Sequence, residues 1–401
     1  MVRKRGGWIF VLAAVSLGAG TIDQRYATNA NCQACHMQIS KQWETSRHAH
    51  SHFTKNDLYD KSIRYLLAHN ILKTREELVV ECAKCHNPRI EKRKINNADK
   101  LGLLLEIDTE TMDKMINSAT MRNGINCIVC HNVEEIHLQK ENPKIRGFDA
   151  VKFGPQGIMF GPFDGAKSPY HLTRKQNFFV EDPNRLCFVC HYSDRNAHGV
   201  EIYATGREYE AASSNGGKLH CIECHMSGKK EGVASNYRGK GGMVERRVRD
   251  HLFASIDNST MYKKYLDADA RIADGKVEIT LTNRAPHKVP TGYGLRRLEL
   301  QLLFVGEKDR KTGEAHKVFS AVWTDKNGEP TIPHLAAKKV EDQRIPAYGK
   351  LTESFPIPSG TRLINYKLIY RQIGKELAKK LGVSDPFFTR AMVLKNGVIE
   401  P

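Results

Sequence analysis

The word Cys32-Gln33-Ala34-Cys35-His36 lies near the start of the chain, and its pattern, C-x-x-C-H, occurs four more times. The later words are CAKCH, CIVCH, CFVCH and CIECH, which end at His86, His131, His191 and His225. The five words use every cysteine of the chain: Cys32, Cys35, Cys82, Cys85, Cys127, Cys130, Cys187, Cys190, Cys221 and Cys224. This pattern is the attachment signature of c-type haem.

The spacing of the word follows from the chemistry of haem attachment. Two cysteines three positions apart on a short helical turn fit the two vinyl groups of one haem, and the next histidine then points its imidazole at the iron. Zinc sites and disulfides give no reason for a histidine after every pair. The sequence therefore predicts five covalently bound haem c groups with proximal ligands His36, His86, His131, His191 and His225.

The N-terminus resembles a secretory signal peptide. Arg3, Lys4 and Arg5 precede the apolar stretch that begins at Trp8, and small residues follow it. The stretch from Trp8 to Ile22, directly before the first acidic residue, is 15 residues long, fewer than the roughly 20 that span a bilayer. We expect residues 1–20 to be removed, with an uncleaved anchor as the alternative. Export to the periplasm or beyond agrees with haem c, which bacteria attach outside the cytoplasm.

The net charge is basic. The 401 residues carry a formal charge of +17 at pH 7, of which the predicted signal peptide holds three. Each ferric haem contributes about −1 through its two ionised propionates, which leaves a mature protein near about +9. Such a protein docks well on an acidic redox partner or an anionic membrane, although membrane association is not required. Export and the lack of a nucleic-acid motif argue against nucleic-acid binding.

The words divide the chain into two regions. All five lie in residues 21–250, which are predicted to form a mainly α, loop-rich multihaem cytochrome c domain in which haems replace much of the side-chain core. Helical periodicity covers Asp57 to Val80 and Leu101 to Ile116. Gly147 to Pro169 is rich in Gly and Pro and is predicted to be an irregular loop.

The pattern changes after a predicted linker at residues 251–270. Apolar residues alternate with polar ones at Val277, Ile279 and Leu281, and turn residues separate the apolar runs that follow. This predicts a small antiparallel β-sandwich-like domain over residues 271–373. A short helix from Lys375 to Leu381 and a tail complete residues 374–401.

Twelve histidines lie outside the words, and five six-coordinate haems need five of them as second ligands. His171 lies in the constrained turn SPYH, and His251 follows a basic stretch. His287 lies between prolines in TNRAPHKVPTG, so iron ligation there would join the β-domain to the haem domain. The predicted distal ligands are His48, His52, His171, His251 and His287.

The fifth distal ligand stays open among several histidines. The candidates are His50, His52, His69, His137 and His198. His220 adjoins Cys221 and has little room to reach over the same haem, whereas His316 and His334 are expected at the surface of the β-domain. Methionine ligation at one haem is a further alternative, and it would raise the potential of that haem.

Several segments resemble the bacterial multihaem cytochrome c family related to the tetrahaem cytochrome c of ammonia oxidisers. The first word is followed by Trp43-x-x-Ser46-x-His48-Ala49, in which the family's histidine is a distal ligand. The segments from Gly161 to His171, CIECH with Met226, and Asn283 to Gly292 are also similar to family motifs. The relative has four haem words and this chain has five, so ligands do not transfer haem by haem.

The leading hypothesis is an exported electron carrier with closely packed, mostly bis-histidine haems. Its partners would be redox proteins, such as a membrane quinol dehydrogenase or a terminal reductase. One alternative is a multihaem reductase of nitrogen compounds or oxyanions with one open haem, although all five words keep the histidine that such enzymes often replace with lysine. A subunit of an extracellular haem filament or surface complex is the other alternative. No catalytic residue is predicted.

Overall fold

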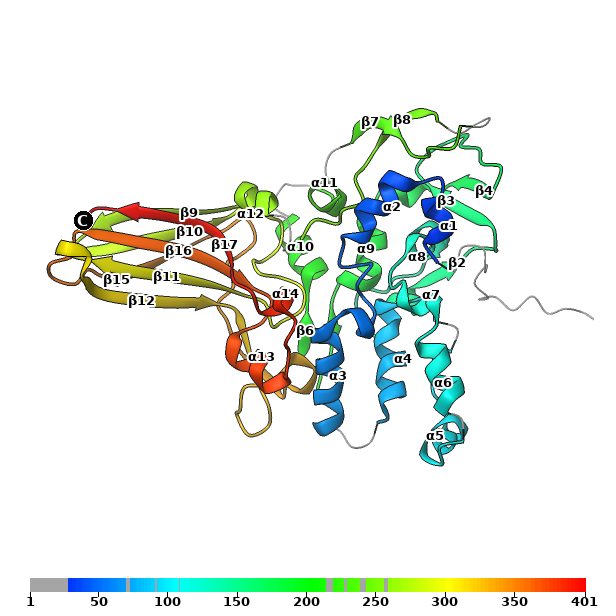
Figure 1. The fold of residues 1–401 in the computed structure, drawn as a ribbon, viewed down its shortest axis with the longest axis horizontal. Coiled ribbons are helices and arrows are strands. Elements are labelled where there is room, and N and C mark those ends of the chain that lie inside the picture. Colours follow the sequence, from blue (N-terminus) through cyan, green and yellow to red (C-terminus); the bar gives the residue numbers. More distant parts are fainter. Residues whose placement is uncertain are drawn as a thin grey trace, which may run out of the picture.

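The structure, a computed structural model, describes residues 28–69, 73–90, 92–107, 109–213, 219–226, 229–238, 243–255 and 259–401. The predicted signal peptide lies outside these residues. Figure 1 shows a region of short helices, drawn from blue to green, beside an elongated region of strands that ends at the C-terminus. No helix in the described ranges is both long enough and apolar enough to cross a membrane.

The helical region is built from short elements. The α-helices are α1 (Ala30–Gln33), α2 (Met37–Glu44), α3 (Asp57–His69), α4 (Arg75–His86), α5 (Asn97–Leu104), α6 (Thr109–Ile116), α7 (Ala119–Arg122), α8 (Cys127–His131), α9 (Asn184–His191), α10 (Thr205–Ser213) and α11 (Cys221–His225). The 3-10 turns are η2 (Phe53–Lys55), η3 (Gly147–Ala150) and η4 (Asn177–Phe179). A capping box in which Thr74 and Glu77 exchange hydrogen bonds fixes the start of α4.

Small sheets separate these helices. They pair β1 (Val133–Ile136) with β2 (Val151–Phe153), β3 (Ile158–Gly161) with β4 (Leu172–Lys175), β5 (Asp194–Arg195) with β6 (Glu201–Tyr203), and β7 (Lys230–Val233) with β8 (Glu245–Val248). Only the β3–β4 pair among them is parallel. The described residues of this region thus form short helices together with small sheets, so a mainly α domain is not confirmed. The expected irregular loop from Gly147 to Pro169 is corrected, since it contains η3, β2 and β3.

The strand region has two antiparallel sheets. One has the order β15 (Lys350–Pro356), β10 (Lys276–Asn283), β9 (Leu266–Ala273). The other has the order β12 (Lys311–Phe319), β11 (Arg297–Val305), β16 (Leu363–Arg371), β17 (Met392–Ile399). Both sheets contribute to one apolar core, in which Ile279 and Leu281 of β10 pack with Leu298 and Leu300 of β11. The strands predicted from the alternation of apolar and polar residues around Val277 to Leu281 are confirmed.

A small hairpin connects the helical region and the strand region. The hairpin β13 (Ala321–Thr324) and β14 (Lys338–Asp342) carries the 3-10 turn η6 (Pro333–Leu335) and packs through Trp323 and Ala336 against Val200. Helices α12 (Ser259–Tyr265), α13 (Lys375–Leu381) and α14 (Pro386–Thr389) and the turn η5 (Glu307–Asp309) complete the chain.

Two expected boundaries differ from the structure. Strand β9 begins at Leu266, inside the stretch predicted as a linker. The predicted tail contains β17, which pairs with β16 along its length. The short helix α13, by contrast, has the predicted bounds.

Candidate haem-binding sites

Each of the five words lies at a short helix. Words two and four form the last turns of α4 and α9, and words three and five form α8 and α11. The first word begins inside α1 and ends directly before α2. This places the two sulfurs of each word on one helical turn, as haem attachment requires. None of the ten cysteines forms a disulfide. Among the described residues, no group of three or more His, Cys, Asp or Glu side chains is arranged to bind a bare metal ion.

All five words open into one cavity. The cavity has a volume of about 1810 Å³, and all ten cysteines and all five word histidines line it. An ordinary small-molecule pocket has roughly 300–1,000 Å³. Apolar side chains such as Leu58, Val129 and Phe188 form much of the wall. A space of this size, lined by attachment residues of every word, is suited to several large apolar cofactors rather than one.

Four of the word histidines face a second histidine across this cavity. The ring centroids are 6.4 Å apart for His36 and His171, 6.2 Å for His131 and His251, 6.4 Å for His225 and His287, and 6.1 Å for His191 and His48. Two metal–imidazole bonds of about 2 Å, together with the distance from each nitrogen to its ring centre, give a separation of about 6 Å. The four pairs therefore fit an iron ion bound between two imidazoles.

The ring orientations leave a nitrogen free for metal binding. In His86 and in most of the paired histidines, the Nδ1–H donates to a backbone carbonyl. This bond fixes the tautomer and leaves Nε2 available for a metal ion. The acceptors are the carbonyl oxygens of Ala234 for His36, Ser51 for His86, Phe160 for His131, Ala254 for His225, Arg249 for His251 and Lys288 for His287. These distances lie between 2.6 and 3.1 Å.

Burial keeps His48, His191 and His251 neutral. It lowers the pKa of His48 to about 3, and the nearby His191 and His225 add to the effect. Burial also lowers the pKa of His191 and of His251 to about 4. A neutral imidazole is the form that binds a metal, so no proton has to be displaced from these rings at neutral pH.

Words that are distant in sequence are in contact. Side-chain hydrogen bonds join Cys32 to Cys127, Cys85 to Cys190, and Cys187 to Cys221. The first word therefore adjoins the third, and the fourth adjoins both the second and the fifth. The five words therefore form two contact groups, one of words one and three and the other of words two, four and five, and both groups line the same cavity.

Comparison with known proteins agrees with this geometry. Residues 67–237, which include the last four words, match the family described as outer membrane cytochrome MtrC/MtrF-like, domains II/IV. The fold is that of a penta-heme cytochrome c552 from Thermochromatium tepidum, with a TM-score of 0.70 over 93% of this chain and 98% of that chain at 18% identity.

Part of the chain thus matches a multihaem cytochrome family, and the chain shares the fold of a solved penta-heme cytochrome. A second solved structure, the X-ray structure of Northeast Structural Genomics Consortium target SoR45, aligns with 34% of this chain and 82% of its own chain at 10% identity, with a TM-score of 0.16. No match was found among curated proteins.

The structure divides the predicted distal histidines into two groups. His48, His171, His251 and His287 each face a word histidine. His52 does not line the cavity. Its Nδ1 bonds to the Thr54 hydroxyl at 2.8 Å and its Nε2 donates to the Ile116 carbonyl at 2.8 Å, so both ring nitrogens hold backbone structure together. These contacts give no support to iron ligation by His52, which stays a prediction from the sequence.

The other histidines outside the words also differ in whether they line the cavity. His50, His69, His137, His198 and His316 do not line the cavity. His334 does line it, contrary to the expectation of a surface residue. The signal for His334 is weak in the sequence because the turn that carries it lies in a hairpin of the β region, far from every haem word.

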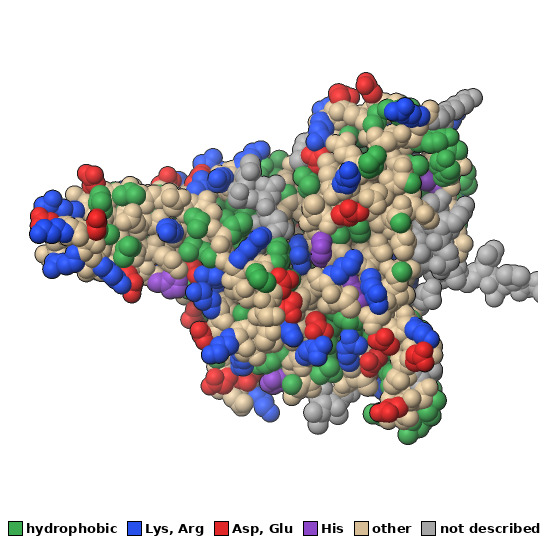
Figure 2. All heavy atoms as spheres, in the orientation of Figure 1, with side chains coloured by type: hydrophobic (Ala, Val, Ile, Leu, Met, Phe, Trp, Pro, Cys, Tyr) green, Lys and Arg blue, Asp and Glu red, His purple; other side chains and the backbone are tan. Residues whose placement is uncertain are grey.

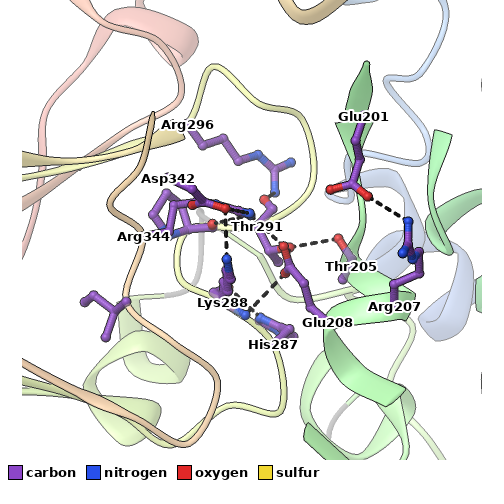
Figure 3. A network of polar contacts seen from close by, with 12 residues as sticks. Glu201, Thr205, Arg207, Glu208, His287, Lys288, Thr291, Arg296, Asp342 and Arg344 are labelled. Carbon is purple, nitrogen blue, oxygen red and sulfur yellow. Dashed lines mark hydrogen bonds and ion pairs between the residues drawn. The ribbon is translucent and has the colours of Figure 1, made fainter. Parts of the chain in front are cut away.

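A buried polar network lies beside His287 at the junction of the two regions (Figure 3). Glu208 of α10 accepts hydrogen bonds from the Lys288 backbone N–H at 3.2 Å and the Thr291 hydroxyl at 2.7 Å, and it pairs with Arg344 at 2.7 Å. Since Lys288 directly follows His287, this network fixes the loop that presents the imidazole to the fifth word.

Arg296 also belongs to this junction. Its Nη1 donates to the Thr291 carbonyl at 2.8 Å, whereas its Nε is buried and has no hydrogen-bond partner among the described residues. A buried guanidinium with an unpaired N–H is costly unless a ligand completes its bonds. A haem propionate has the carboxylate oxygens that this group requires, which is a second observation in favour of haem in the cavity.

Proposed function

We propose that the protein is an exported pentahaem c-type cytochrome that transfers electrons between redox partners. The observation that carries the proposal is the set of four histidine pairs in a cavity lined by all ten cysteines. Two histidine ligands leave an iron no open position for a substrate, which suits electron transfer. Haem c, when bound, supplies a one-electron Fe(III)/Fe(II) couple.

The residues of the chain have separate roles in this proposal. Each cysteine pair attaches one haem, and the histidine of the same word is its proximal ligand. His171, His48, His251 and His287 are the distal ligands for words one, four, three and five. Arg296 binds a propionate. The contacts between words keep the attachment residues close together, as a path of closely spaced redox centres requires.

The partners are proposed to be redox proteins, among them a membrane quinol dehydrogenase or a terminal reductase. The basic composition supports docking on acidic partners or an anionic membrane surface. Figure 2 shows lysine and arginine side chains scattered over both regions on the visible face. The N-terminal sequence and the match to outer membrane cytochromes support export to the periplasm or the cell surface.

The test uses protein matured in a host with haem-ligation machinery. We expect intact-mass spectrometry to find five haems and a cleaved N-terminus. We expect low-temperature electron paramagnetic resonance of the oxidised protein to be dominated by low-spin ferric haem. Turnover of nitrite, hydroxylamine or tetrathionate at the rates of dedicated reductases would overturn the carrier function, and a polypeptide mass without haem would overturn both the cofactor and the function.

A multihaem reductase is the second candidate, and one observation favours it. The ring stacked against His86 is that of Tyr59, with centroids 4.3 Å apart, rather than a second histidine at about 6 Å. An iron at the second word would be open if no side chain completed its coordination. The same spectra decide this candidate, because an open ferric haem gives a high-spin signal in the wild-type protein.

A role in a surface electron-transfer complex or haem filament is the third candidate. The match to outer membrane cytochromes favours it. Proteolysis of intact cells tests it, since a surface protein is cleaved without membrane permeabilisation and a periplasmic one is protected. Light scattering of the purified protein separates a filament from a discrete monomer.

A further inference from the structure

The second haem word differs from the other four in its surroundings. Its histidine, His86, donates Nδ1–H to the Ser51 carbonyl at 3.0 Å and stacks on Tyr59, with ring planes 24° apart. These contacts fix the His86 ring from one side and leave its other nitrogen toward the cavity. The proposed function leaves the second ligand of this iron unassigned.

The histidines that line the cavity leave few candidates for this position. There are eleven, of which five belong to the words and four face them as pairs. The remaining two are His220 and His334. His220 directly precedes Cys221 and so stands at the attachment point of the fifth word, whose iron His287 already faces. His334 is the one with no other assignment.

His334 lies near His86. Both residues line the same cavity. Leu335, next to His334, packs in one apolar cluster with Leu58 of α3, and the neighbouring Tyr59 stacks on His86. The His334 ring packs beside Tyr293, with centroids 5.7 Å apart. Its Nδ1 is buried and has no hydrogen-bond partner among the described residues. A buried ring nitrogen without a hydrogen bond is costly unless a ligand satisfies it.

The turn that carries His334 is held firmly against the haem region. The side-chain amide of Asn196 donates to the carbonyl of Pro333 at 2.8 Å and to the carbonyl of Ala336 at 2.7 Å, one on each side of His334. Ile332 and Ala336 are both fully buried at 0% exposure. Asn196 follows the fourth word, which contacts the second word through Cys190 and Cys85. One amide therefore positions the His334 turn relative to the second haem word.

We propose that His334 is the second axial ligand of the haem attached through Cys82 and Cys85. This inference rests on the proposed function, in which that haem is bound at all. The β region then supplies two iron ligands, His287 on one loop and His334 on another, and its docking on the haem region sets the coordination of two separate haems. All five irons become bis-histidine, which removes the open site that a reductase needs.

The test compares His334→Ala with His316→Ala in the fully matured protein. His316 is an exposed histidine of β12 in the same region, so its variant controls for loss of a β-region imidazole. We expect one of five haems to become high-spin in His334→Ala and the reduced variant to bind about one carbon monoxide per chain. His316→Ala and the wild type should show neither change. His334→Met should return that haem to low spin with a raised potential.

Asn196→Ala is the second variant, because it leaves the His334 side chain in place. We expect a partial high-spin signal, since the turn loses both of its anchoring hydrogen bonds. Two results would overturn the ligation by His334 without affecting the other four assignments. One is a wild-type protein with one high-spin and four low-spin haems, and the other is a fully loaded His334→Ala protein with an unchanged spectrum. Fewer than five haems by mass would instead refute the pentahaem function itself.

Discussion

His287 of the β region faces His225 of the fifth haem word, with ring centroids 6.4 Å apart and planes 27° apart. The two residues come from different regions of the fold, so an iron between them would be a cross-link as well as a redox centre. We expect His287→Ala to convert one haem to high spin and to weaken the attachment of the β region. Electron paramagnetic resonance and limited proteolysis measure the two effects.

The control for His287→Ala is His198→Ala, which replaces an exposed histidine that does not line the cavity. It should leave both the spectrum and the proteolysis pattern as in the wild type. A low-spin spectrum in the His287→Ala protein with all haems present would show that another group ligates this iron.

His52 is expected to matter for stability and not for the haem spectra. Its side chain is 3% exposed, and its Nε2 bonds to the Ile116 carbonyl at 2.8 Å. His52→Ala leaves that buried carbonyl without its partner, which costs about 1–3 kcal/mol. Urea unfolding should show the loss, and the low-spin signals should be unchanged. A high-spin signal in this variant would restore His52 as a ligand.

The haem words are easier to recognise in the sequence than the fold around them. The words are local, so ten cysteines and five histidines are recognised without any tertiary information. His48, His171, His251 and His287 are predicted from the sequence as distal ligands, and in the structure each of them lies opposite a word histidine.

The failures have physical reasons. His334 reaches the cavity only because its hairpin extends from the β region and packs against the haem region. Hydrogen bonds of Trp323 on the hairpin and of Asn196 on the haem region make this contact, which joins segments far apart in sequence. Strand β17 was missed because it is an edge strand in which only Leu394 is buried, so its residues show little apolar alternation. The small sheets of the haem region are too short to leave a periodic pattern.

Gly147 is expected to control the position of the second haem word. Its φ is +55°, and a Cβ at this position would lie 1.8 Å from the carbonyl oxygen of Lys84. Lys84 belongs to the second word, where it lies between Cys82 and Cys85. Gly147→Ala would therefore strain the backbone and displace the end of α4. We expect a lower melting temperature and a changed spectrum for the haem that His86 ligates.

The matched control for Gly147→Ala is Gly360→Ala. Gly360 also has a positive φ, +77°, but a Cβ there meets nothing within 4 Å. That variant carries the backbone strain without the collision, so it should lose some stability and keep the wild-type spectrum. Equal spectral changes in both variants would contradict a specific role for the Gly147 contact.

The ion pairs at the junction predict a loss of stability in acid. Burial opposes ionisation of Asp342, but the hydrogen bonds and charges of Arg344 and Lys288 outweigh it and hold the pKa of this carboxyl well below its usual range. Lys339 also faces it, at 3.7 Å. A lowered pKa in the folded state stabilises the protein above the unfolded value of about 3.9, and this contribution is lost as the pH falls below it.

We therefore expect Asp342→Asn to lower the free energy of unfolding by about 2 kcal/mol at pH 7 and by much less at pH 3, where the wild-type carboxylate becomes protonated in the unfolded chain. Urea unfolding followed by the fluorescence of Trp323, which lies in the same hairpin, measures the difference. Glu307→Gln is the control, because its ion pair with Arg362 is exposed on both sides and such pairs contribute little. A stability difference for Asp342→Asn that stays constant from pH 7 to pH 3 would show that the charge of Asp342 does not stabilise the junction.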